Sequence, residues 1–184
     1  MKKRLLIIGG VVVVVLILVM NFGIQIGDVR IGKQNDTLGI KQDVALENSL
    51  FSEEYLASDA VICINLWATW CKPCIEEMPM LNEIKKTYSG QNVRFISFSV
   101  DTDSVKLVQF NEKGIFEFKD ITLENLAYKT AIMNFLDGKP LDNKINSYSV
   151  PATYLVKDNK VVHKIVGAIG DKQELMKEIN ALLD

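Results

Sequence analysis

The sequence predicts an α/β fold built on one mixed sheet. An apolar segment leads directly into a Cys-X-X-Cys pair that begins an amphipathic helix, strand-like and helical segments then alternate, and the chain closes with a hairpin and a helix. Strands joined by crossover helices lie parallel, whereas a hairpin adds antiparallel strands. The expected product is an α/β sandwich whose central sheet contains both kinds of pairing.

The first strand of this sheet is expected at Ala60–Leu66, where a nearly continuous apolar run suits a strand buried on both faces. The next segment has apolar side chains at helical spacing, at Ile75, Met78, Leu81 and Ile84. This helix is expected to end near Gly90. Pro73 fits its first turn, and Pro79 lies further in, where it is expected to cause a kink.

The later elements are assigned in the same way. Strands are expected at 93–100 and 115–118, helices at 105–113 and 122–136, a hairpin at 152–156 and 160–166, and a closing helix at 171–183. The turn Asp101–Ser104 is expected to cap the helix that follows it. Helical spacing in the second helix is carried by Leu123, Leu126, Ala127, Ala131, Ile132 and Phe135.

Cys71 and Cys74 are the candidate reactive groups. Three residues apart on one helical turn, their sulfur atoms can approach closely enough to bond. Unpaired N–H groups and the helix dipole favour the thiolate at Cys71, which is expected to be the exposed cysteine. Cys71 would attack a partner's disulfide, and the deeper Cys74 would resolve the mixed disulfide.

Residues 65–74, Asn-Leu-Trp-Ala-Thr-Trp-Cys-Lys-Pro-Cys, resemble the active-site segment of thioredoxin-fold proteins. With Glu77 and Pro79 following, the segment is most similar to the membrane-anchored TlpA/ResA-like thiol-disulfide oxidoreductases. A second segment, Ser-Val-Pro-Ala-Thr-Tyr-Leu-Val at 149–156, resembles the cis-proline loop and following strand of that family. The resemblance covers roughly Asp59 to the C-terminus. It implies a thioredoxin-like three-layer sandwich, with a helical insertion before the cis-proline loop.

The resemblance also implies roles for individual residues. The Val150–Pro151 bond would be cis, and the backbone of Val150 would pair with an extended substrate segment. Trp70, beside Cys71, would shape the partner-binding surface. Lys72 and Pro73 complete the Cys-X-X-Cys segment, and the Lys72 charge would favour the thiolate of Cys71.

Glu77 matches a glutamate that modulates the cysteines in ResA-like proteins. A partly buried carboxyl there would have a raised pKa and could exchange a proton with Cys74. The alternative is a solvated helix charge like Glu76. Cytosolic thioredoxins have a buried aspartate where this chain has Asn65, so such a duty would move to Glu77.

The first residues predict a membrane anchor. Lys2, Lys3 and Arg4 precede Leu5–Met20, which contains no polar or charged side chain. We expect a signal anchor at 1–26, a tether at 27–45 with a short strand at 29–31, and a thioredoxin-like domain at 46–184. The chain would span the bacterial cytoplasmic membrane once, with its domain facing the periplasm or the outside. A cleaved signal peptide is the competing interpretation.

Composition and cysteine usage limit the partners. The net charge of −2 includes three N-terminal cations and leaves no basic patch for nucleic acid. No cofactor is expected beyond a redox-active Cys71–Cys74 disulfide. Cys63 is expected to be a core residue, so a zinc site combining the three cysteines with His163 is the weaker alternative.

The expected function is an extracytoplasmic reductase of protein disulfides, supplied with electrons by a membrane donor. The resemblance suggests two substrate classes, apocytochrome c or a broader set of misoxidised envelope proteins. A disulfide oxidase or isomerase, a peroxiredoxin-like thiol peroxidase, and a binding module with a static disulfide remain alternatives.

Overall fold

The computed structural model describes residues 24–26, 29–31, 45–141, 143 and 148–183. The chain divides into two units, residues 1–40 and 41–184. In the first unit, β1 (Ile24–Ile26) pairs antiparallel with β2 (Val29–Ile31), which confirms the short strand expected at 29–31.

The expected N-terminal anchor lies mostly outside the described residues. Residues 1–23 are not among them, and the last three residues of the anchor, Ile24–Ile26, form β1. Within the part of the chain that the structure describes, no helix has both the length and the apolar character needed to cross a bilayer.

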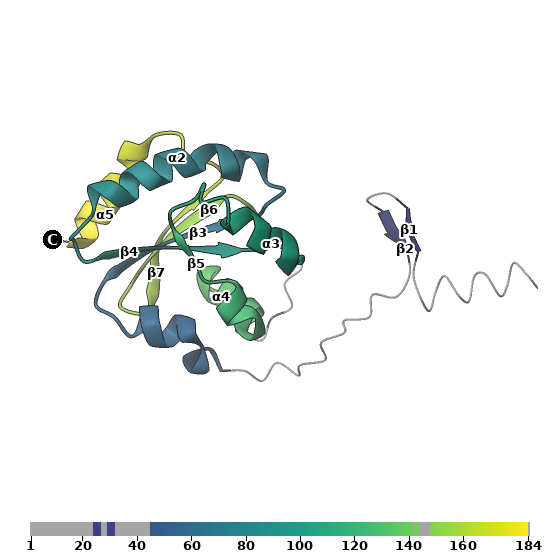
Figure 1. Cartoon of the computed structure of the whole chain (residues 1–184). Coiled ribbons are helices and arrows are strands. Elements are labelled where there is room, and N and C mark those ends of the chain that lie inside the picture. The colour runs from purple at the N-terminus through teal and green to yellow at the C-terminus, as the bar shows by residue number, and fades with distance from the viewer. Residues whose placement is uncertain (1–23, 27–28, 32–44, 142, 144–147, 184) are drawn as a thin grey trace, which may run out of the picture. The chain divides into compact units, whose positions relative to one another are not determined.

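A five-stranded mixed sheet forms the centre of the second unit (Figure 1). Its strands lie in the order β5-β4-β3-β6-β7, and β3 pairs parallel with β4 and antiparallel with β6. The strand bounds are β3 Val61–Trp67, β4 Val93–Ser99, β5 Lys119–Asp120, β6 Ala152–Lys157 and β7 Lys160–Val166. The expected parallel crossover and terminal hairpin are therefore confirmed.

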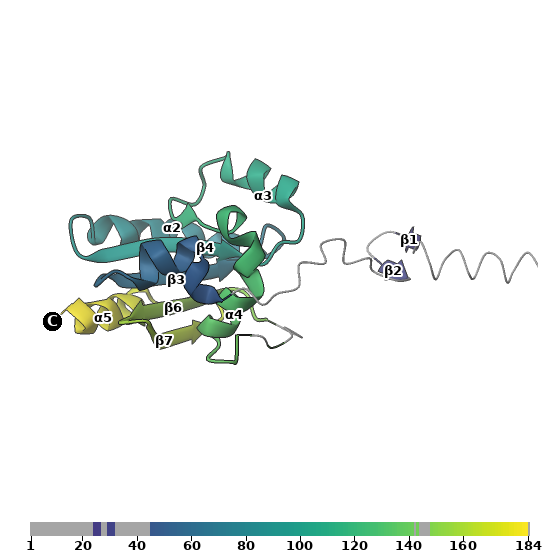
Figure 2. The same ribbon diagram turned by 90° about the horizontal axis from the view of Figure 1, so that it is seen from below.

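Helices cover both faces of this sheet, which gives the three layers seen in Figures 1 and 2. One face carries α2 and α5, and the other carries α4 with the short helices η1 and η2. The bounds are η1 Leu46–Asn48, η2 Ser52–Leu56, α2 Lys72–Thr87, α3 Ser104–Asn111, η3 Leu123–Tyr128, α4 Lys129–Leu136 and α5 Lys172–Leu183. α2 continues through Pro79.

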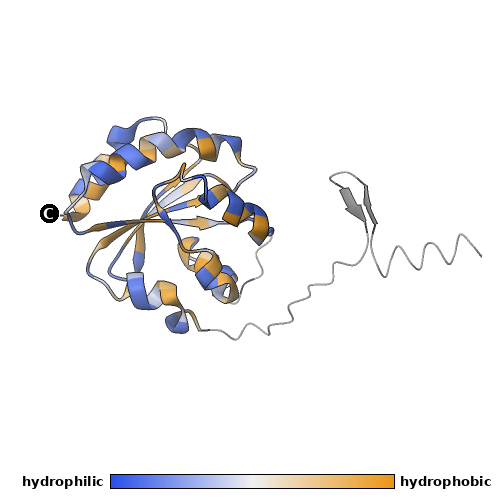
Figure 3. Ribbon diagram, viewed as in Figure 1, coloured by the Kyte–Doolittle hydropathy of each residue, from blue (hydrophilic) through white to orange (hydrophobic). Residues whose placement is uncertain are grey.

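Successive side chains of β3 point to opposite faces of the sheet, and they divide the hydrophobic core between those two faces. Val61 and Cys63 pack in a cluster with apolar side chains of α2 and α5, whereas Ile62, Ile64 and Leu66 pack in a cluster that includes α4. All seven residues of β3 are buried, as expected for a central strand. In Figure 3 the inner strands are predominantly apolar, in agreement with this burial.

The strand expected at 115–118 is wrong, because the pairing lies further along the chain. Ile96 pairs with Lys119 and Ser97 with Asp120. Phe116 and Phe118 instead stack on each other with ring centroids 4.5 Å apart. Their side chains pack into the core without a backbone ladder.

The continuous helix expected at 122–136 is also wrong. It is divided into η3 and α4, and Asn125 has the non-helical angles φ −121° and ψ 21°. The Asn125 side chain is fully buried, accepts from Phe51 N–H at 3.0 Å and donates to the Ile121 carbonyl at 2.9 Å. Such side chain–backbone bonds compete with helical ones. Leu123 and Leu126, two of the residues that carried the expected helical spacing, are exposed.

The hairpin expected between 152 and 166 is confirmed. Its two turn residues, Asp158 and Asn159, have positive φ angles of 50° and 60°. Positive φ at both central residues is the geometry of a type I′ turn, which matches the twist of the flanking strands. The hairpin fixes β6 and β7 beside β3, and β6 begins directly after Pro151.

Candidate active site

Cys71 and Cys74 form a disulfide at the start of α2, with their Cα atoms 5.3 Å apart. Cys71 is the N-cap residue, and its sulfur accepts a hydrogen bond from Cys74 N–H at 3.3 Å. Pro73 lies in the first turn of the helix, as expected, where a missing N–H costs no helical bond. The Cys71 sulfur therefore lies where backbone N–H groups and the helix dipole favour negative charge.

The expectation that Cys71 is exposed is wrong for the disulfide form. Cys71 is 4% exposed and Cys74 is fully buried, because each sulfur is bonded to the other inside the turn. The accessible neighbours are Trp70, which is 64% exposed, and Lys72, whose side chain is 85% exposed. Lys72 pairs with Glu76 at 3.6 Å. Trp70 and Lys72 thus form the part of this turn that a partner can reach.

The Val150–Pro151 bond is cis, as expected from the resemblance. Leu66, near the end of β3, pairs with Ala152, the first residue of β6. Because the two strands are antiparallel, the turn that follows β3 and the loop that precedes β6 emerge at the same end of the sheet. The fold therefore brings the Cys71–Cys74 turn and the Val150–Pro151 loop together at that end.

Glu77 is buried, so the alternative of a solvated helix charge is wrong. It is 5% exposed, and its carboxylate accepts from Asn65 Nδ2 at 3.0 Å and from Ile169 N–H at 3.1 Å. Burial raises the pKa of Glu77, and the hydrogen bonds from Ile169 and Asn65 offset only part of this shift. Glu76, by contrast, has a largely exposed side chain.

Asn65 joins Glu77 to the sheet. It is fully buried on β3 and donates through Nδ2 to Glu77 and to Thr153 Oγ1, the latter at 3.1 Å. Its Oδ1 atom has no hydrogen-bond partner among the described residues. The residue that replaces the aspartate of cytosolic thioredoxins therefore contacts the glutamate on α2 directly.

Cys63 is a core residue, as expected. It is fully buried, and burial together with the negative charge of Glu77 raises the pKa of its thiol. His163 lies on β7 with Nδ1 3.7 Å from Glu178, and Cys71 is bonded to Cys74. Across the described residues, His, Cys, Asp and Glu side chains form no group of three or more arranged to hold a metal ion.

Asp101 was missed as a site residue, because the sequence placed it only in a turn. Its carboxylate accepts from Thr69 N–H at 2.7 Å, from Thr69 Oγ1 at 2.8 Å and from Ser99 Oγ at 2.7 Å. Lys129 Nζ donates to the Asp101 carbonyl at 2.7 Å, and burial lowers the pKa of this lysine. Asp101 thus ties the residue two before Cys71 to the end of β4. Asp103 caps α3 as expected.

The sequence profile of the Redoxin family matches residues 33–179. The chain belongs to the Redoxin family. Its similarity to thioredoxin-fold proteins of the TlpA/ResA type rests on curated relatives and on solved structures together.

Among the curated relatives, thiol-disulfide oxidoreductase ResA of Geobacillus thermodenitrificans is 27% identical over 124 residues, covering 66% of this chain and 62% of the relative. ResA of Bacillus cereus is 33% identical over 110 residues, covering 58% and 54%. Thioredoxin-like protein YneN of Bacillus subtilis is 26% identical over 119 residues, covering 65% and 63%. The chain therefore spans less than two thirds of the length of these relatives.

Solved structures show the same fold. The crystal structure of a thiol:disulfide interchange protein of the thioredoxin family from Chlorobium tepidum has a TM-score of 0.53 at 18% identity, covering 72% of this chain and 85% of that one. A DsbE-type structure from the same organism has a TM-score of 0.54 at 23% identity, covering 68% and 82%. The expected thioredoxin-like fold with a mixed central sheet is confirmed.

Proposed function

We propose that this chain is a thiol-disulfide oxidoreductase that acts on protein substrates. The observation that carries the proposal is the Cys71–Cys74 disulfide at the first turn of α2, at the same end of the sheet as the Val150–Pro151 loop. The names of the relatives support the same activity. The disulfide is the redox group, and no further cofactor is part of the proposal.

In the reducing direction, the Cys71 thiolate attacks one sulfur of a substrate disulfide, and the other substrate sulfur leaves as a thiolate. The Cys74 thiolate then attacks the Cys71 sulfur, which releases the second substrate thiolate and forms the Cys71–Cys74 disulfide. Two electrons pass from the protein to the substrate. A dithiol donor returns them, and we assign that role to a membrane donor. Glu77, as the buried acid one turn beyond Cys74, exchanges the proton of that thiol.

We assign the reducing direction to this site. Lys72 would push the pair toward oxidation by stabilising the Cys71 thiolate, but its ammonium is highly exposed and pairs with Glu76. Solvent and this ion pair screen its effect on the sulfur. A reduction potential near ~−270 mV would agree with a reductase, whereas one near ~−120 mV would reverse the direction.

We further propose that the N-terminal segment that precedes β1, with its apolar run Leu5–Met20, anchors the protein in the bacterial cytoplasmic membrane and that the domain acts outside the cytoplasm. The support is the basic cluster at Lys2–Arg4 before the apolar run Leu5–Met20. The substrates we propose are disulfides of envelope proteins, with apocytochrome c as one class. Protease treatment of spheroplasts tests this topology, and a domain that stays protected contradicts it.

Two cysteine variants test the activity. Cys71→Ser is expected to abolish exchange, and Cys74→Ser is expected to accumulate a mixed disulfide between Cys71 and the substrate. Both are followed by gel mobility under non-reducing conditions, with the Cys63→Ala variant as the control. A static structural disulfide would instead resist dithiothreitol, and its function would survive Cys71→Ser.

A further inference from the structure

A small cavity of about 200 Å³ opens beside the Val150–Pro151 loop, on the face of the sheet that carries α4. Leu66 and Met133 are its buried apolar lining, and Val166, which is 59% exposed, forms part of its edge. Tyr148 and Ser149, the residues directly before Val150, line it as well. The loop assigned to substrate pairing is therefore also a wall of this cavity.

The strand register fixes how close the cavity lies to that loop. Leu66 and Val166 both pair with Ala152, one from each neighbouring strand. Directly paired residues point to the same face of a sheet, so Leu66 and Val166 lie level with the residue that follows Pro151. Because side chains of an extended peptide alternate every ~3.3 Å, a substrate paired with Val150 places side chains near its cysteine within reach of the cavity.

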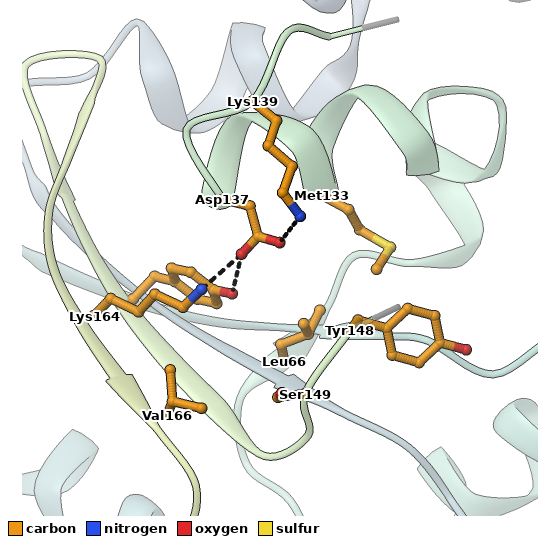
Figure 4. A pocket seen from close by; sticks show the side chains of 9 residues that line it. Leu66, Met133, Asp137, Lys139, Tyr148, Ser149, Lys164 and Val166 are labelled. Atoms are coloured by element: carbon orange, nitrogen blue, oxygen red, sulfur yellow. Dashed lines mark hydrogen bonds and ion pairs between the residues drawn. The ribbon is translucent and has the colours of Figure 1, made fainter. Parts of the chain in front are cut away.

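The charged side of the cavity carries an excess positive charge. Asp137 lies between Lys139 and Lys164, as Figure 4 shows, and accepts from their ammonium groups at 3.0 Å and 2.7 Å. Tyr154 donates to the same carboxylate at 3.0 Å. Two lysines against one aspartate leave a net charge of +1 among the lining residues.

These two ammonium groups have donors to spare. Each carries three N–H groups, and within the described part of the chain Asp137 is the only hydrogen-bond partner of either. Burial opposes the ionisation of Asp137, but the hydrogen bonds from Lys164, Lys139 and Tyr154 outweigh it and lower its pKa. The carboxylate therefore stays charged and holds both lysines in place, which reduces the entropy lost when they bind a further anion.

We propose that this cavity is a substrate subsite that binds an acidic side chain, Glu or Asp, close to the reactive cysteine of the substrate protein. The methylene groups of that residue contact Leu66, Met133 and Val166, and its carboxylate bridges Lys139 and Lys164. The inference rests on the proposed thiol-disulfide exchange and names the substrate class it favours.

The test uses the reduced protein and neutral-ended peptides that each carry one cysteine as a mixed disulfide with 2-mercaptoethanol. In each peptide, one of the three positions before or the three positions after the cysteine carries Glu, Gln or Lys, and a separate peptide is made for each position and residue. At one or more positions, the second-order rate constant for exchange of the reduced protein with the Glu peptide is expected to exceed that for the Lys peptide by about three- to tenfold at low salt. Lys164→Gln should reduce this preference and Lys164→Glu should reverse it. Lys139→Gln, in the loop that follows α4, gives a second independent variant.

Lys160→Gln is the matched control, since Lys160 is exposed on the same strand but does not line the cavity. It should keep the preference, and it should reduce the neutral bis(2-hydroxyethyl) disulfide at the wild-type rate. Equal rates for all peptides, or a preference that persists in Lys164→Gln and disappears in Lys72→Gln, would overturn the subsite while leaving the activity intact. A wild-type protein that exchanges with no disulfide would overturn the proposed function and the subsite together.

Discussion

Replacing Asp101 tests how the active-site turn is held. Asp101 is 7% exposed, and its carboxylate accepts three hydrogen bonds from Thr69 and Ser99, at 2.7, 2.8 and 2.7 Å. Hydrogen bonds to a charged group contribute ~1.5–3 kcal/mol each, and their contributions are not additive. In Asp101→Ala the Thr69 N–H also loses its acceptor. We therefore expect the free energy of unfolding to fall by about 3–4 kcal/mol.

Asp101→Asn separates the loss of charge from the loss of shape. The amide keeps one oxygen acceptor for Thr69, so we expect a smaller loss of about 1–2 kcal/mol. Asp59→Ala is the control, because the Asp59 side chain makes no hydrogen bond or ion pair with the rest of the described chain, and its effect should stay within about 0.5 kcal/mol. Only its carbonyl oxygen accepts a bond, from Lys157.

Urea unfolding followed by tryptophan fluorescence measures all three variants. The slope of the free energy of unfolding against urea concentration should be the same in the variants as in the wild type, so that a shift in the urea midpoint reports the change in stability. If Asp101→Ala loses less than about 1 kcal/mol, water or a neighbouring group replaces the carboxylate, and Asp101 does not hold the turn.

Three further predictions concern buried polar groups and thiols. Because the folded pKa of Glu77 is raised, chiefly by burial, its stabilising contribution is complete below the unfolded value of ~4.3 and is lost as the pH rises through the folded pKa. The free energy of unfolding of the wild type, relative to that of Glu77→Gln, should therefore fall as the pH rises from about 4, by about 1.4 kcal/mol per unit of pKa shift. Glu76→Gln, the control, should show no such trend. A difference in stability between the wild type and Glu77→Gln that does not change with pH would contradict the prediction. In the reduced folded protein, iodoacetamide should label Cys71 well before Cys74 or Cys63, as mass spectrometry of quenched samples would show; equal labelling would remove the asymmetry on which the mechanism depends. Asn125→Ala should lower the free energy of unfolding by about 2–4 kcal/mol, since it leaves the buried Phe51 N–H unpaired, and a urea midpoint equal to wild type would rule this out.

The sequence predicts the elements whose signal is local. The apolar run before Cys71, the periodicity of α2, and the turn at Asp158–Asn159 each depend on neighbouring residues, and each is found in the structure. The cis bond before Pro151 follows from resemblance to a family segment, and spacing alone would not have indicated it.

The errors come from interactions across long sequence separations. Asn125 interrupts the helix expected at 122–136 because its side chain bonds to Phe51, 74 residues earlier. β5 begins at Lys119 because its partner in β4 sets the register. Asp101 had a usable signal, since it follows a buried strand and the carboxyl ends of neighbouring parallel strands meet at one edge of a sheet.

The exposure of Cys71 was mispredicted for a chemical reason. A helix-start thiol was expected to be accessible, but the structure contains the disulfide, in which Cys71 and Cys74 shield each other. Accessibility of the nucleophile is a property of the reduced state. The labelling experiment above therefore begins with the reduced protein.

The pairing of Asn65 with Glu77 explains how one buried acid can serve this site. Two carboxylates at these positions would lie within hydrogen-bonding distance, and their mutual repulsion would force the protons to leave in two coupled steps. An amide at position 65 instead donates to Glu77 at 3.0 Å, so the site keeps one titrating carboxyl. Burial, with the charge of Glu77 as a smaller cause, raises the pKa of the Cys63 thiol, and this disfavours the reactive thiolate there. Cys63 is fully buried in the core, whereas Cys71 and Cys74 form the disulfide at the start of α2, so these two are the cysteines placed for exchange.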